Sequence, residues 1–131
     1  MARGQQFHTN QTHYLRKTLA VGSITSGVAV NLGYLPARAV VLGASAVVST
    51  AFDSATSDVL NIGTSADGDG FATSLDISSV GLKAADELAT SNDLYVTSET
   101  LLTATWTGAG TAPTVGTVIV VVEYAVDNEY A

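Results

Sequence analysis

The sequence predicts an all-β domain, an antiparallel β-sandwich or jelly roll of about eight strands, with an extended N-terminal arm. Apolar residues recur at every second position in several short stretches, which is typical of half-buried strands. Clusters of Gly, Asp, Asn, Ser and Pro separate these stretches at intervals of about 8 to 15 residues, and helical periodicity is almost absent. Short alternating strands at this spacing favour two packed sheets.

The N-terminal residues follow neither the helical nor the strand period. They are polar, with isolated aromatic residues, so we expect an extended arm at 1–14 and one β-sandwich domain at 15–131. Alternation then predicts strands at 15–21 and 28–34. Pro36 follows the second of these and predicts a bend or an edge position, because proline cannot donate a ladder hydrogen bond.

The longest alternating stretch spans 35–64 and predicts a hairpin around a turn at 53–58, which is rich in Ser, Thr and Asp. The short second strand of this hairpin places Leu60 and Ile62 on one face. The residues expected on the apolar face of the first strand are Val40, Leu42, Ala44, Ala46, Val48 and Phe52.

The second half of the chain predicts short strands at 75–77, 80–82 and 94–96. The only helical candidate is 83–89, which is two turns at most and could equally be a loop. The stretch 101–107 is cleanly half-buried, with Trp106 on its apolar face and Thr103 on its polar face.

The strand at 117–126 is apolar on both faces, which indicates cover on both sides. Val118, Val120 and Val122 share one face. Ile119 and Val121 lie on the other, and we expect them to meet either a covering loop or a neighbouring subunit. They are the predicted subunit interface.

Charge is scarce and unevenly distributed. The chain is 47% hydrophobic and 13% charged. Such a composition favours either a surface that largely meets other protein or simply an uncharged β domain. Four bases precede Asp53, while twelve acids and one base lie from Asp53 onward. An acidic body with so few bases predicts no binding to nucleic acid.

Composition also limits the compartments and chemistries that we expect. The chain has no cysteine, so disulfides and thiolate metal sites are excluded. The longest aliphatic run, at 118–122, is far shorter than the roughly 20 residues that cross a bilayer. The N-terminus lacks an apolar signal segment, so we expect a soluble protein with no membrane partner.

No motif predicts catalysis or a cofactor. His8 and His13 have no carboxylate near them in sequence and form a poor metal site, and no nucleotide-binding loop is present. Asp67 and Asp69 resemble the start of a calcium loop, but Phe71 and Ser78 occupy later ligand positions, so a structural turn is favoured. Trp106 alternates in phase with apolar neighbours, which favours a core residue over a sugar-stacking platform. We therefore expect a protein that is not an enzyme.

Two stretches of the chain resemble a known family. LPARAVVLGASAVVSTAFD, followed by DVLNIGTSADGDGFAT, resembles small virion proteins of tailed bacteriophages, the head decoration or cement proteins, over about 35–77. VGTVIVVVEY, at 115–124, is also in keeping with them. The resemblance implies a sandwich or jelly-roll module that assembles as a dimer or trimer on the outside of the major capsid protein shell and stabilises it. It carries over no catalytic residues.

The resemblance implies a partner and a location for this chain. The expected partners are the major capsid protein and further copies of the chain, on the capsid exterior of a virion assembled in the host cytoplasm. The arm is the expected docking element, with Phe7 and Tyr14 as apolar anchors and Arg3, Arg16 and Lys17 as charges. The alternatives are a tail or neck connector and a carbohydrate-binding module at a fibre tip, the latter requiring Tyr95 or Trp106 to lie open.

Overall fold

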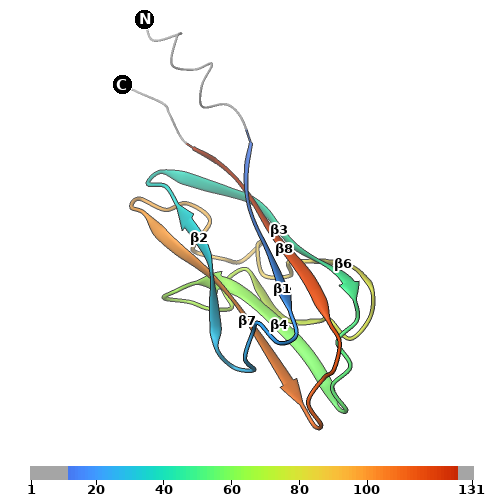
Figure 1. Cartoon of the computed structure of the whole chain (residues 1–131). Coiled ribbons are helices and arrows are strands. Elements are labelled where there is room, and N and C mark those ends of the chain that lie inside the picture. Colours follow the sequence, from blue (N-terminus) through green and yellow to red (C-terminus); the bar gives the residue numbers. More distant parts are fainter. Residues whose placement is uncertain (1–11, 127–131) are drawn as a thin grey trace, which may run out of the picture.

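A computed structural model describes residues 12–126 as two four-stranded antiparallel sheets packed face to face (Figure 1). The first sheet contains, in order, β1 (His13–Ala20), β8 (Thr117–Val126), β3 (Ala39–Thr50) and β6 (Gly81–Ala84). The second contains β2 (Ala29–Leu35), β7 (Thr100–Ala109), β4 (Ser57–Thr64) and β5 (Ala72–Asp76). The predicted all-β sandwich of about eight strands is confirmed.

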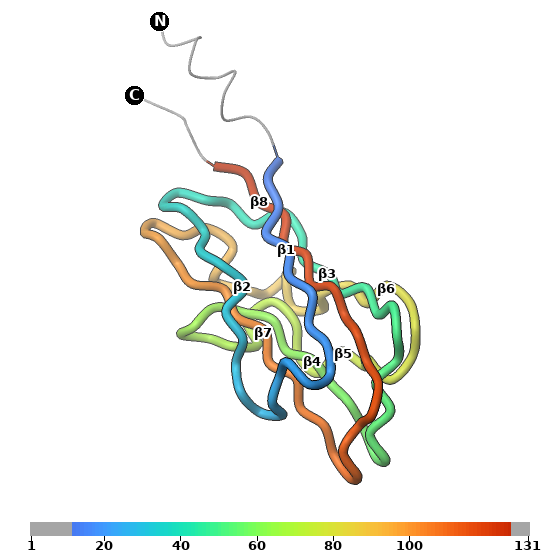
Figure 2. Tube along the Cα trace, in the orientation of Figure 1, coloured from blue at the N-terminus to red at the C-terminus, as the bar shows by residue number. Residues whose placement is uncertain are grey.

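Most connections cross from one sheet to the other, as the trace in Figure 2 shows. Among the strands in residues 12–126, only β4 and β5 are consecutive and pair with each other. The hairpin expected at 35–64 is therefore wrong: β3 pairs with β6 and β8, whereas β4 pairs with β5 and β7. The bend expected at Pro36 is confirmed, since the chain crosses there from β2 to β3.

The core lies between the sheets and is made by alternate residues of each strand. Fully buried side chains from both layers meet there, and the largest are Phe52, Phe71, Leu19, Leu35, Leu60, Ile62, Ile77 and Leu102. The inward positions expected for β8 and β7 are confirmed, because Val118, Val120, Val122, Leu102, Ala104 and Trp106 are all buried.

A β-bulge changes the phase of β3. The register with β8 shifts between Val41 and Gly43, so Leu42 is an extra residue in the ladder. Val41 is buried and Leu42 is 54% exposed, which is the reverse of the expectation for Val40 and Leu42. Beyond the bulge the predicted face holds, since Ala44, Ala46 and Val48 are buried.

The helical candidate at 83–89 is not a helix. Lys83 and Ala84 belong to β6 and pair with Ala46 and Ser45 of β3. The backbone N–H of Glu87 then donates to the carbonyl of Phe71 at 3.0 Å. These tertiary hydrogen bonds stabilise the observed conformation more than helical hydrogen bonds would, because a helix of two turns is only marginally stable on its own. No helix in residues 12–126 is long and apolar enough to cross a membrane.

Candidate functional site

The outer face of the first sheet is unusually apolar. Thr18, Ile119, Val47 and Leu82 form one row across its four strands, and Arg16, Val121, Ser45 and Ala84 form the next row. We call Val47, Leu82, Ala84, Ile119 and Val121 the apolar face. Leu82 is 67% exposed and Val47 is 37% exposed, so large side chains remain in contact with solvent. Contiguous patches of this kind mark interaction sites.

The predicted interface residues Ile119 and Val121 lie at the centre of this face. Both are half-buried, because β1 and β3 flank β8 on either side. The sequence did not single out Val47 or Leu82 as their neighbours. Two consecutive valines, Val47 and Val48, were the one available signal, since they place an apolar residue on each face of β3.

Two opposite charges lie beside the apolar face. Arg16 pairs with Val121, and Glu123 is the next outward residue of β8, opposite Tyr14. The Glu123 carboxylate leans the other way, toward β3, since a Cβ on Gly43 would lie 3.4 Å from its Oε1. No other charged side chain lies at an outward position of the first sheet in the described range.

The outer face of the second sheet is polar. Thr105 lies between Ala29 and Asn61 in one row, and Thr103 lies between Asn31 and Gly63 in the next. Hydroxyl and amide groups of this kind are readily solvated, so the two outer faces of the sandwich differ in chemistry. Within residues 12–126 the first sheet presents the longer run of outward apolar side chains, whereas the second has the pair Tyr34 and Leu101 at one end.

Thr103 is more enclosed than its polar face predicts. It is 4% exposed, because the loop at 65–70 folds back over this part of the second sheet. Gly63, the cross-strand neighbour of Thr103, permits this contact: a Cβ on Gly63 would lie 2.1 Å from the carbonyl oxygen of Asp67. The loop therefore covers the sheet where side chains are smallest.

The predicted docking residues are only partly within the described range. Arg3 and Phe7 lie outside it. Tyr14, Arg16 and Lys17 belong to β1 and are exposed. Adjacent residues of a strand point to opposite faces, so Tyr14 and Arg16 lie on the outer face and Lys17 on the other side. The structure thus brings Tyr14 and Arg16 beside the predicted interface residues.

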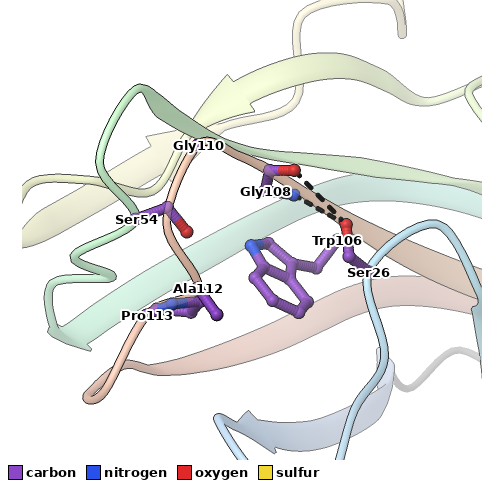
Figure 3. Close-up of a pocket in the computed structure, with 7 residues that line it drawn as sticks. All are labelled: Ser26, Ser54, Trp106, Gly108, Gly110, Ala112 and Pro113. Atoms are coloured by element: carbon purple, nitrogen blue, oxygen red, sulfur yellow. Dashed lines mark hydrogen bonds between the residues drawn. The ribbon is translucent and has the colours of Figure 1, made fainter.

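A small pocket of about 150 Å³ lies beside Trp106 (Figure 3). Its indole lies between Ser26 on one side and Ala112 and Pro113 on the other (Figure 3). Trp106 is only 7% exposed and packs against Phe52, with ring centroids 5.6 Å apart. The ring is therefore a core residue, as expected, and offers no open platform for a sugar.

A cluster of carboxylates borders the loop at 65–70. A Cβ on Gly70 would lie 2.9 Å from Oδ2 of both Asp67 and Asp93. The hydrogen bond with Asp69, local desolvation and the negative charges of Asp69 and Asp93 raise the pKa of Asp67 above its usual value. In residues 12–126, no group of three or more metal-ligating residues has a geometry suited to a metal ion.

The same loop is held by turn hydrogen bonds. Thr64 and Asp67 exchange backbone hydrogen bonds of 2.9 and 3.2 Å, and the Asp67 N–H also donates to Thr64 Oγ1. This geometry is that of the structural turn favoured by the sequence.

His13 stacks on Tyr124 with ring centroids 5.5 Å apart, while His8 lies outside the described residues.

Comparison with known proteins gives structural likeness without sequence likeness. No model of a known protein family matches the sequence, and no curated protein matches it. The chain is similar to a chain of the cyanophage Pam1 capsid asymmetric unit, with a TM-score of 0.67 and 20% identity over 91% of this chain and 87% of that chain.

Two further solved structures show the same likeness. A chain of the Ralstonia phage GP4 capsid has a TM-score of 0.68 and 14% identity, covering 92% of this chain and 88% of that chain. A chain of the acidic stable capsid of Helicobacter pylori bacteriophage KHP30 has a TM-score of 0.65 and 18% identity, covering 93% and 96%. The protein therefore shares the fold of chains found in the capsids of three bacteriophages.

Proposed function

We propose that this protein is a capsid component of a tailed bacteriophage, a decoration or cement protein that binds the outside of the major capsid protein shell and stabilises it. The observation that carries the proposal is the fold, which matches chains of three phage capsids over about nine-tenths of this chain. The resemblance of 35–77 to decoration proteins supports the same role.

The chemistry of the chain favours binding over catalysis. Within residues 12–126 the pocket at Trp106 is small, and its walls come from the core and from turns. The broad surface with an unusual composition is the outer face of the first sheet. A structural protein acts through such surfaces, and an assembled shell offers a repeating partner for them.

The proposed contact with the shell is the N-terminal arm together with the start of β1. Tyr14 is 60% exposed and Lys17 is exposed, so an aromatic anchor and a positive charge are available there. Arg3 and Phe7 would extend this contact along the arm. Arg16, like Tyr14, lies on the outer face of the first sheet.

Attachment to particles that lack this protein tests the proposal. Purified full-length protein should bind such particles in sedimentation and raise the temperature at which they release their genome. A truncation that removes residues 2–11 should keep the thermal melt of the domain, because β1 begins at His13, but should bind much more weakly.

The contribution of charged residues to attachment can be separated from that of aromatic residues. Phe7→Ala should weaken attachment at every salt concentration, whereas Arg3→Ala should matter mainly at low salt. Thr107→Ala, on the outer face of the second sheet, is the matched control. If full-length protein fails to bind the particles, or binds as well without the arm, the decoration role by this route is refuted.

The carbohydrate-binding alternative is weakened by one observation. Trp106 is buried, so of the two aromatic residues considered as a sugar platform only Tyr95, which is 48% exposed, remains.

A connector in the tail or neck would have the same composition and fold class. Electron cryomicroscopy of the virion, which locates the chain on the head or on the tail, distinguishes these roles.

A further inference from the structure

The loop at 65–70 contains both Asp-Gly pairs of the chain, Asp67-Gly68 and Asp69-Gly70, and the sequence has no Asn-Gly pair. The backbone nitrogen of a residue can attack the side-chain carboxyl group of the aspartate before it and close a five-membered ring. The ring closes most easily when the second residue is glycine, which has no side chain to obstruct the approach and has the widest choice of backbone conformations. These two pairs are therefore where the chain is most open to spontaneous rearrangement.

The hydrogen bonds of the loop distinguish the two pairs. The backbone N–H of Gly70 donates to the carbonyl of Asp67 at 3.0 Å, so the nitrogen that would attack Asp69 is already engaged. Within residues 12–126 the backbone N–H of Gly68 makes no hydrogen bond. Breaking an existing hydrogen bond costs free energy, so the nitrogen of Gly68 can turn toward its carboxyl group more easily than that of Gly70.

Space and solvent are also available at Gly68. A Cβ on Gly68 would meet nothing within 4 Å, whereas a Cβ on Gly70 would lie 2.9 Å from Oδ2 of both Asp67 and Asp93. Asp67 and Gly68 are exposed, so water can reach a ring that forms between them. The backbone at Gly68 can therefore rotate without meeting a neighbouring side chain.

The neighbours of Asp67 favour the reactive form of its carboxyl group. Ring closure expels the carboxyl hydroxyl as water, so the protonated acid reacts more readily than the carboxylate. The hydrogen bond with Asp69, local desolvation and the negative charges of Asp69 and Asp93 raise the pKa of Asp67. Glu87 lines the same polar pocket and adds a further acid there. The proton is therefore retained at a higher pH than on an isolated aspartate.

We propose that Asp67 is a site of spontaneous isomerisation to isoaspartate. The nitrogen of Gly68 forms a bond to Cγ of Asp67, and the carboxyl hydroxyl leaves with the amide proton as one water molecule. A second water molecule then breaks the bond between this nitrogen and the main-chain carbonyl carbon of Asp67. The chain now runs through Cγ, and its composition is unchanged. The reaction needs no oxidant, reductant or cofactor, and the proposal does not rest on a role in a capsid.

Isomerisation should loosen the loop from the second sheet. The carbonyl oxygen of Asp67 accepts hydrogen bonds from the N–H groups of Thr64 at 2.9 Å and Gly70 at 3.0 Å. In isoaspartate this carbonyl becomes a side-chain carboxylate, and the main chain gains one carbon, so the turn cannot keep its geometry. Cover over Thr103, which is 4% exposed, is then lost. We expect the isomerised protein to melt at a lower temperature than the fresh protein.

Prolonged incubation of the folded full-length protein, below its melting temperature, tests the proposal. Peptide mapping with electron-transfer dissociation distinguishes isoaspartate from aspartate at each residue. Isoaspartate should accumulate several-fold faster at Asp67 than at Asp69. Gly68→Ala should slow the reaction at Asp67 several-fold, because a side chain then obstructs the attacking nitrogen. The melting temperature of this variant should be nearly unchanged, since its Cβ meets nothing within 4 Å.

Incubation in urea is the matched control for the role of the fold. The unfolded chain lacks the loop hydrogen bonds, so Asp67 and Asp69 should then isomerise at similar rates. The proposal is overturned if no isoaspartate forms at Asp67, or if Asp69 reacts as fast in the folded protein. It is also overturned if Gly68→Ala leaves the rate unchanged, or if the preference for Asp67 persists in urea. None of these outcomes depends on whether the protein binds particles.

Discussion

The indole nitrogen of Trp106 donates a 2.9 Å hydrogen bond to Oδ1 of Asp58, whose side chain is 1% exposed. Asp58 also accepts hydrogen bonds from the backbone N–H of Ser54 at 2.9 Å and from its hydroxyl at 2.6 Å. Ser54 belongs to the crossing between the sheets, whereas Asp58 and Trp106 belong to paired strands of the second sheet. One buried carboxylate therefore ties the crossing to the core.

Removing this carboxylate should destabilise the fold. Asp58→Ala leaves the Trp106 N–H and both Ser54 donors without their acceptor, which should cost about 1.5 to 3 kcal/mol. Urea unfolding followed by circular dichroism measures the change. Glu99→Ala, which removes the same charge from an exposed position, is the control and should stay within about 0.5 kcal/mol. Equal unfolding midpoints for the two variants would contradict the role of Asp58.

The contact between the loop at 65–70 and the second sheet requires a glycine. Gly63→Ala would place its Cβ 2.1 Å from the Asp67 carbonyl oxygen and 2.7 Å from backbone atoms of Gly68 and Gly70. The backbone must move, so we expect the free energy of unfolding to fall by about 1 to 3 kcal/mol. Gly68→Ala meets nothing within 4 Å and should have little effect. A thermal melt of the two variants, side by side, checks this contrast.

Asp67 should reduce stability at neutral pH. Its pKa is raised, first by the hydrogen bond with Asp69, so the folded protein holds this proton more tightly than the unfolded chain. The favourable contribution is complete below the unfolded pKa and is lost as the pH rises through the folded pKa. Asp67→Asn should therefore raise the melting temperature at pH 7, and the gain should shrink in acid. A gain that is the same at both pH values would indicate another cause.

Asp53 should behave in the opposite way. It accepts hydrogen bonds from the N–H groups of Val115 and Thr114 and from the Thr114 hydroxyl, and these bonds lower its pKa below 3.8. Its contribution to stability is present above the unfolded pKa and is lost as the pH falls through the folded pKa. Asp53→Asn should lower the melting temperature at pH 7 and match the unchanged protein in strong acid. Carbon-13 NMR titration of the Asp53 carboxyl measures the pKa directly.

Where apolar and polar residues alternate without interruption along a strand, the sequence correctly predicted which side chains point into the core. Trp106 in β7 and Val120 in β8 point inward as the period of two requires. Leu42 points outward because a bulge adds one residue to the ladder, and its residue type gives no sign of this. Thr103 is polar and yet buried, because cover by a loop distant in sequence depends on the folded backbone rather than on alternation.

The sequence predicted where the strands lie better than it predicted which strands pair with each other. Ser, Thr and Asp at 53–58 correctly predict a change of direction, but turn residues do not specify whether the next strand pairs or crosses to the other sheet. The same limit applies to the candidate site. Ile119 and Val121 were identified from the two-sided apolar pattern of one strand, whereas Val47 and Leu82 joined them only once the register between strands was known.

The position of β8 between β1 and β3 has a consequence for how the protein folds during synthesis. β1 leaves the ribosome before the other strands in residues 12–126, yet its ladder partner is β8, so Leu15 cannot pair until Val122 has been synthesised. Until then β1 lacks its neighbour in the sheet, and one side of β3 is an unpaired edge. Pairing over such a sequence separation makes closure of the first sheet a late and comparatively slow event.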